Sequence, residues 1–102
     1  MLNEKARAYV ELGDSTSAFH FYQEALSANL PDFSFSTLNQ LPPLEAKPLQ
    51  VITYLTSLHE KALLHSATRN VEDWEIATQL WNTALHWLEK MQFQATYRTS
   101  KL

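Results

Sequence analysis

The residues Ala18-Phe-His-Phe-Tyr-Gln-Glu-Ala-Leu26 are decisive for the fold, because a matching stretch, Ala77-Thr-Gln-Leu-Trp-Asn-Thr-Ala-Leu85, follows in the second half of the chain. In both stretches a small residue, an aromatic residue and another small residue recur at the spacing of one helix face. The small residues let paired helices approach closely, and the aromatic ring fills the groove between them. This internal repeat predicts two helical hairpins that stack on one another.

The positions of proline and glycine divide the chain around these stretches. All four prolines lie between residues 31 and 48, and the single glycine is Gly13. Proline disrupts helix interiors, and one glycine is too few for hairpin-rich β structure, so we predict an all-α fold of about four helices. The expected single domain, 1–102, comprises a first hairpin at 1–30, a proline-containing insertion at 31–48, and a second hairpin with a tail at 49–102.

Local signals place the ends of the helices. Gly13 suits the left-handed end of the first helix, and either Asp14 or Ser15 suits the start of the second. The third helix is expected over 49–67 and the fourth over 71–94. The insertion carries phenylalanine and leucine side chains, which favour packing along the helices over a solvent-exposed tether.

The fourth helix is predicted to be apolar on two sides. Trp74 and Trp81 belong to one stripe, which we assign to the core. A second stripe consists of Ile76, Leu80 and Trp87. Two repeats are fewer than the roughly three needed to bury a continuous core, so we expect a homo-oligomer or contact with further repeats. Ile76, Leu80 and Trp87 are the candidate self-association surface. The alternative is that the insertion folds back over this stripe with Phe33 and Phe35.

Composition excludes several classes of function. Apolar residues make up 45% of the 102 residues and charged residues 19%, which suits one folded domain. The net charge of −3 opposes nucleic-acid binding, which requires a basic surface. The absence of cysteine excludes disulfides and thiolate chemistry, and a single glycine excludes phosphate-binding loops. No signal peptide or membrane-spanning stretch is visible, so we expect a cytoplasmic protein with no membrane contact and no cofactor.

Polar residues that could suggest an enzyme have structural explanations. The positions of His59 and His65 place them about 240° apart around a helix, so they cannot bind one metal ion. Asn70 is expected to cap the fourth helix, with Asp73 in the reciprocal capping position and Glu72 favoured by the helix dipole. Since no polar residues converge, we expect neither a metal site nor catalysis.

In its motifs the chain resembles the tetratricopeptide repeat. The first unit has Ala6-x2-Tyr9, Gly13-Asp14, the stretch 18–26 and Pro31, in the order typical of that family. The second unit departs more, because His65 replaces the tyrosine and neither a turn glycine nor a following proline is present. The resemblance covers most of the chain outside the insertion and implies an α-solenoid.

The same resemblance implies a groove, lined by the first helix of each hairpin, for a protein or peptide partner. The candidate groove residues are Asn3, Arg7, Val10, Glu11, Thr56, His59, Leu63 and Ser66. These residues are mixed rather than basic, so they do not favour a groove that binds the carboxylate group of a partner. The alternative is that they are simply exposed helix positions. We therefore expect a non-catalytic protein–protein interaction module, used as a scaffold or as the sensing part of a larger protein. The alternatives are a purely structural, self-associating repeat and a small enzyme, which the lack of convergent polar residues opposes.

A more particular resemblance is to the repeat regions that precede caspase-like CHAT domains in bacterial proteins. It rests on Pro42-Pro43-Leu44, on Leu58-x2-Lys61-Ala62, on the aromatic-rich fourth helix and on the ending from Tyr97 to Lys101. A CHAT domain carries a histidine–cysteine pair, and this chain has no cysteine. The resemblance implies a non-catalytic piece of such a protein or an independent repeat protein.

Overall fold

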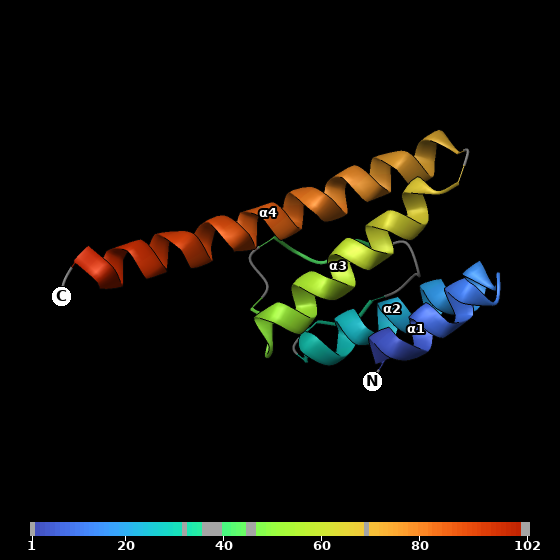
Figure 1. Ribbon diagram of the computed structural model, residues 1–102, viewed down its shortest axis with the longest axis horizontal. Coiled ribbons are helices and arrows are strands. Elements are labelled where there is room, and N and C mark those ends of the chain that lie inside the picture. The colour runs from blue at the N-terminus through green and yellow to red at the C-terminus, as the bar shows by residue number, and fades with distance from the viewer. Residues whose placement is uncertain (1, 32, 36–39, 45–46, 69, 101–102) are drawn as a thin grey trace.

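The computed structural model describes residues 2–31, 33–35, 40–44, 47–68 and 70–100, with side chains described up to Met91. Within these ranges the chain forms helices and no strand, which confirms the predicted all-α class. The helices are α1 (Leu2–Glu11), α2 (Ser15–Asn29), α3 (Val51–Ser66) and α4 (Val71–Ser100) (Figure 1). The ending from Tyr97 to Lys101, which contributes to the resemblance to CHAT-associated repeats, lies outside the described side chains.

The turn between α1 and α2 follows the local signals of the sequence. Gly13 has a φ of 80°, the left-handed conformation that glycine adopts without steric cost. Asp14 caps α2, because its carboxylate accepts hydrogen bonds from the backbone N–H of Ser17 at 3.1 Å and from the Ser17 hydroxyl at 2.7 Å. These bonds hold the pKa of Asp14 below its usual value. Both parts of the predicted turn are confirmed.

Asp14→Ala is expected to lower the thermal midpoint Tm by about 5 °C, because the first turn of α2 loses the acceptor for its N–H groups. Circular dichroism at increasing temperature measures the change. Asp14→Asn keeps a side-chain acceptor and is expected to retain nearly the full Tm. Equal losses in the two variants would show that the carboxylate acts through its charge rather than as a cap.

The α4 helix is longer than predicted. It continues to Ser100 instead of ending near residue 94, and its C-terminal part extends past the other three helices (Figure 1). Neither proline nor glycine occurs in 49–102, so the sequence contains none of the residues that usually end a helix. The predicted end near residue 94 follows from the end of the apolar stripe, which reports packing and not the ability of the backbone to continue the helix.

The helices form two antiparallel pairs. Helix α1 packs on α2 and α3 packs on α4, while α2 and α3 form the main contact between the pairs (Figure 1). Asn29 joins the pairs at the two ends of the insertion. Its carbonyl oxygen accepts a hydrogen bond from the N–H of Leu49, and its side-chain oxygen accepts one from the N–H of Gln50, both at 2.9 Å. The insertion therefore leaves the helices and rejoins them at the same place.

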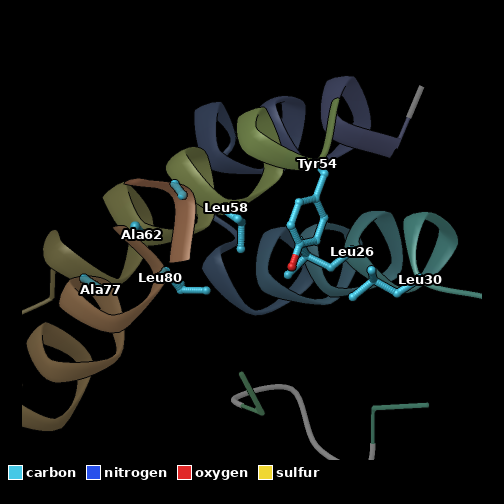
Figure 2. Close-up of a cluster of buried hydrophobic side chains, with 8 residues drawn as sticks. Leu26, Leu30, Tyr54, Leu58, Ala62, Ala77 and Leu80 are labelled. Atoms are coloured by element: carbon cyan, nitrogen blue, oxygen red, sulfur yellow. The ribbon is translucent and has the colours of Figure 1, made fainter. Parts of the chain in front are cut away.

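The core lies where α2, α3 and α4 meet. Its buried residues, most of which Figure 2 labels, are Leu26, Leu30, Tyr54, Leu58, Ala62, Ala77, Leu80 and Ala84. Phe33, Phe35 and Leu41 of the insertion pack against this cluster. The rings of Phe33 and Phe35 meet edge to face, with their centroids 4.9 Å apart. The expectation that the insertion packs along the helices is confirmed.

The inward face of α4 differs from the prediction. Leu80 is fully buried in the core, and Ile76 and Trp87 pack partly buried against the same cluster. This stripe is therefore covered within the chain and is not the exposed self-association surface that we expected. Trp74, predicted to be core, is 50% exposed, and Trp81 is only partly buried. The difference arises because α3 and the insertion pack against one strip of α4, centred on Leu80, and not against both predicted stripes.

Candidate functional site

A groove lies between α1 and α3, the first helices of the two pairs. It consists of two adjoining hollows, of about 530 and 330 Å³, and Arg7 lines both. The first hollow lies toward the beginnings of α1 and α3 and includes Leu2, Asn3, Ile52 and Thr53. The second hollow lies at the ends of both helices and includes Val10, Glu11, Leu63, Leu64 and Ala67.

An ion pair lies at the boundary of the two hollows. Nε and Nη2 of Arg7 donate hydrogen bonds to the two carboxylate oxygens of Glu60, the second at 3.0 Å. This two-point geometry gives a strong form of arginine–carboxylate pairing, and it raises the pKa of Arg7. Burial raises the pKa of the neighbouring Tyr22 to about 12, and the charge of Glu60 adds to the effect. The ion pair fastens α1 to α3 across the groove.

The structure brings most of the predicted groove residues together. The first hollow contains Asn3, Arg7 and Thr56, and the second contains Arg7, Val10, Glu11 and Leu63. His59 and Ser66 line neither hollow. Nδ1 of His59 accepts a hydrogen bond from Nε1 of Trp81 at 3.2 Å, on the α4 side of α3, and the Ser66 hydroxyl donates to the carbonyl oxygen of Leu63 at 2.7 Å. The tetratricopeptide pattern therefore places these two residues too far around α3.

Asn3 has a structural role within the groove. It is buried, and its side-chain oxygen accepts a hydrogen bond from the hydroxyl of Ser57 at 2.8 Å. That hydroxyl also donates to the carbonyl oxygen of Thr53 at 3.0 Å. Asn3 thus joins α1 to α3 through its side-chain oxygen.

A third hollow lies farther around α3, between α3 and α4, and Thr56 lines both this hollow and the first. Its lining is mainly apolar and consists of Leu55, Thr56, His59, Trp81, Ala84, Leu85 and Leu88. Leu85 is 53% exposed and Leu88 is 43% exposed, and the half-exposed Trp74 lies on the same helix. This is the apolar surface that α4 leaves open, in place of the predicted stripe around Leu80.

A buried polar cluster lies between α2, α3 and the start of α4, and sequence reasoning missed it. Nζ of Lys61 is fully buried and donates to the side-chain oxygen of Gln23 at 2.6 Å. Burial lowers the pKa of Lys61 to about 8, because desolvation penalises the charged ammonium. The signal that could have revealed it is the position of Lys61 beside Ala62 and one turn after Leu58, on the face that packs.

His65 and Asp73 extend this cluster. Nδ1 of the buried His65 lies 2.8 Å from a carboxylate oxygen of Asp73, and its ring lies 4.3 Å from that of Phe19, measured between centroids. Burial lowers the pKa of His65, and the bond to Asp73 partly opposes this. Asp73 also accepts from the hydroxyl of Thr68 at 2.9 Å. The prediction that Asp73 acts as a reciprocal cap is therefore wrong. Its carboxylate instead bonds to His65 and Thr68 and so holds the turn between α3 and α4.

The predicted cap of α4 is confirmed at Asn70, whose side-chain oxygen accepts a hydrogen bond from the N–H of Glu72 at 2.8 Å. Among the described residues, no group of three or more histidine, aspartate or glutamate side chains is placed to hold a metal ion. Lys61 and His65 line none of the three hollows. Both side chains instead lie in the packed interior between α2, α3 and α4.

Over the part of the chain that the structure describes, no helix has the length and apolar character needed to cross a bilayer. The 30-residue α4 helix is long enough, but charged side chains such as Glu75, Glu89 and Lys90 interrupt it. Comparisons with models of protein families, with curated proteins and with solved structures find no match to this chain, so the resemblance to tetratricopeptide repeats rests on its sequence motifs.

Proposed function

We propose that this chain is a non-catalytic, tetratricopeptide-like interaction module that binds a segment of a protein partner in the groove between α1 and α3. One observation carries the proposal: the first helices of the two pairs lie side by side and line adjoining hollows that share Arg7. A groove between helices suits a helical or extended peptide, held by apolar contacts and a few polar bonds. A cytoplasmic location and a role as a scaffold or as the sensing part of a larger protein belong to the same proposal.

Two features favour binding over catalysis. The ion pair of Arg7 and Glu60 already satisfies the strongest polar groups of the groove. The groups whose pKa values burial lowers, Lys61 and His65, are turned into the buried polar cluster. A catalytic site would need such groups to converge on a space that a substrate can enter.

Self-association is the second candidate function, and the third hollow is the observation that favours it. Leu85 and Leu88 leave an apolar strip of α4 exposed, and α4 extends beyond the other helices (Figure 1). A second copy of the chain that covers this strip would give a homo-oligomer. Leu85 and Leu88 line no part of the groove, and Val10 lies in the second hollow alone, so one experiment separates the two candidates.

Site-specific photocross-linking tests the proposed function. The full chain carries benzoylphenylalanine at Val10 in the second hollow, at Gln79 on the exposed side of α4, or at Leu88 in the third hollow. In the cells from which the protein comes, we expect one defined partner to be linked from Val10 and not from Gln79. The double substitution Val10→Gln and Leu63→Gln, both at side chains exposed by more than two fifths, removes the apolar wall of the second hollow.

The cross-linked products distinguish the outcomes. Addition of the unlabelled chain is expected to compete with the Val10 product, whereas addition of the doubly substituted chain is not. Products of equal yield from Val10 and Gln79 would contradict groove binding. Adducts between copies of the chain, formed only from Leu88, would support self-association in place of groove binding.

A further inference from the structure

The second hollow combines an exposed apolar wall with an excess of negative charge. Val10 of α1 is 41% exposed and Leu63 of α3 is 48% exposed, and both line this hollow together with Leu64 and Ala67. Side chains exposed to this degree leave apolar area that a partner can cover. These apolar side chains can therefore bind one apolar side chain of a partner segment.

The charges at this hollow are unequal. Glu60 and Glu11 contribute carboxylates, and Arg7 contributes a guanidinium that is held by Glu60 through two hydrogen bonds. Glu11 is exposed and forms no ion pair with any residue that the structure describes. Since Arg7 and Glu60 neutralise one another, Glu11 determines the sign of the field.

The backbone adds to this field. The second hollow lies at the last turns of both α1 and α3, where the carbonyl groups carry the negative end of each helix dipole. The last turn of α1 contains no basic side chain, and the one in α3 is the buried His65. Two helix ends and one carboxylate therefore converge here, and none of the residues that the structure describes supplies a compensating cation.

The nearby lysines are turned away from the groove. Nζ of Lys5 on α1 lies 5.9 Å from the ring centroid of Phe21, on the α2 side, and Nζ of Lys61 on α3 is buried against Gln23. Neither lysine lines the first or the second hollow. Neither helix therefore directs a lysine into the second hollow, and the guanidinium of Arg7, which does line it, is held by Glu60.

We infer that the second hollow selects a partner segment with a lysine or arginine next to an apolar side chain. The apolar side chain lies against Val10 and Leu63, and the cation lies beside Glu11 at the ends of α1 and α3. Lysine and arginine suit such a site because their aliphatic stems cover apolar surface while the charged group remains in water. This inference rests on the proposed function and specifies the chemistry of the partner.

Selection from a library of random twelve-residue peptides, displayed on phage and offered to the full chain, tests the inference. Peptides that bind the wild type and not the variant with Val10→Gln and Leu63→Gln depend on the groove. Among these we expect lysine or arginine adjacent to, or one helical turn from, a large apolar residue, at a frequency well above that of the starting library. Acidic residues should be depleted at the same positions.

Affinities of the selected peptides, measured by fluorescence polarisation, test the role of Glu11. Glu11→Gln keeps the shape of the side chain and is expected to weaken binding about two- to fivefold at low ionic strength, with the difference shrinking as salt increases. Glu75→Gln removes the same charge from the exposed side of α4 and is expected to change nothing. Circular dichroism verifies that each variant is folded.

The possible results separate the inference from the proposed function. Groove-dependent peptides without enrichment of lysine or arginine, or with equal affinity for wild type and Glu11→Gln, would overturn the inference and leave the proposed function intact. Peptides that bind the wild type and the doubly substituted variant equally would overturn both, because the groove would then not be the binding surface.

Discussion

Replacing Leu80 with alanine is expected to lower the free energy of unfolding by about 3 kcal/mol. Leu80 has no exposed surface and belongs to the cluster that joins α2, α3 and α4. Truncation removes buried apolar atoms and leaves a cavity that rigid helices cannot close fully. Urea denaturation followed by circular dichroism measures the loss, with an unchanged slope as evidence that both proteins unfold in the same way.

Leu88→Ala is the matched control for this experiment, because it makes the same change on the same helix at a side chain that is 43% exposed. We expect it to cost about 1 kcal/mol or less. If Leu80→Ala does not fold, Leu80→Met, which nearly conserves volume, should fold and lose less than about 1.5 kcal/mol. Equal losses at positions 80 and 88 would show that α4 does not use the Leu80 face for packing.

The second large effect is a rise in stability with pH, caused by Lys61. The pKa of Lys61 falls from 10.5 to about 8 on burial, so between these values the folded chain has lost a proton that the unfolded chain still binds. Unfolding then takes up a proton, and raising the pH opposes it. Between about pH 7.5 and pH 9.5 the free energy of unfolding is expected to rise by about 2 kcal/mol, and the gain is lost as the pH falls through about 8.

The comparison with Lys61→Met isolates this effect, because methionine keeps the apolar stem and does not titrate. The wild type should gain about 2 kcal/mol more than Lys61→Met over this pH range, as measured by urea denaturation. Lys5→Met, at an exposed position on α1, should keep the wild-type slope. Measurements stop below pH 10, because burial raises the pKa values of Tyr22 and Tyr54 and reverses the trend at higher pH. If the free energy of unfolding changes with pH in the same way for wild type and Lys61→Met, the result would contradict a lowered pKa for Lys61.

Features encoded by neighbouring residues could be predicted from the sequence. The left-handed Gly13, the Asp14 cap and the Asn70 cap depend on chemistry within a few residues, so the sequence contains their full cause. The helix pairs are predicted from the repeat of small and aromatic residues, whereas the groove residues are expected from the resemblance to tetratricopeptide repeats. The predicted groove residues on α1 and at Leu63 accordingly meet at the two hollows.

Features that depend on distant partners could not be predicted. Helical periodicity shows which residues of α4 share a face, but the choice between the Leu80 and Trp74 faces depends on where α3 and the insertion pack. Lys61 and His65 are polar residue types that usually lie at surfaces. The burial of Lys61 requires Gln23 of α2, which is distant in the sequence. The burial of His65 requires Asp73 of α4, which the sequence pattern assigns to a helix cap.

The two hydrogen bonds at Asn29 have a consequence for how the molecule folds. Each helix pair is built from contacts close in the chain, whereas docking of α2 on α3 must close the loop that the insertion forms between Asn29 and Leu49. The entropy of closing a loop rises slowly, by about 0.6 kcal/mol for each doubling of its length. We therefore expect the insertion to tolerate added residues at small thermodynamic cost, as long as both hydrogen bonds at Asn29 are kept.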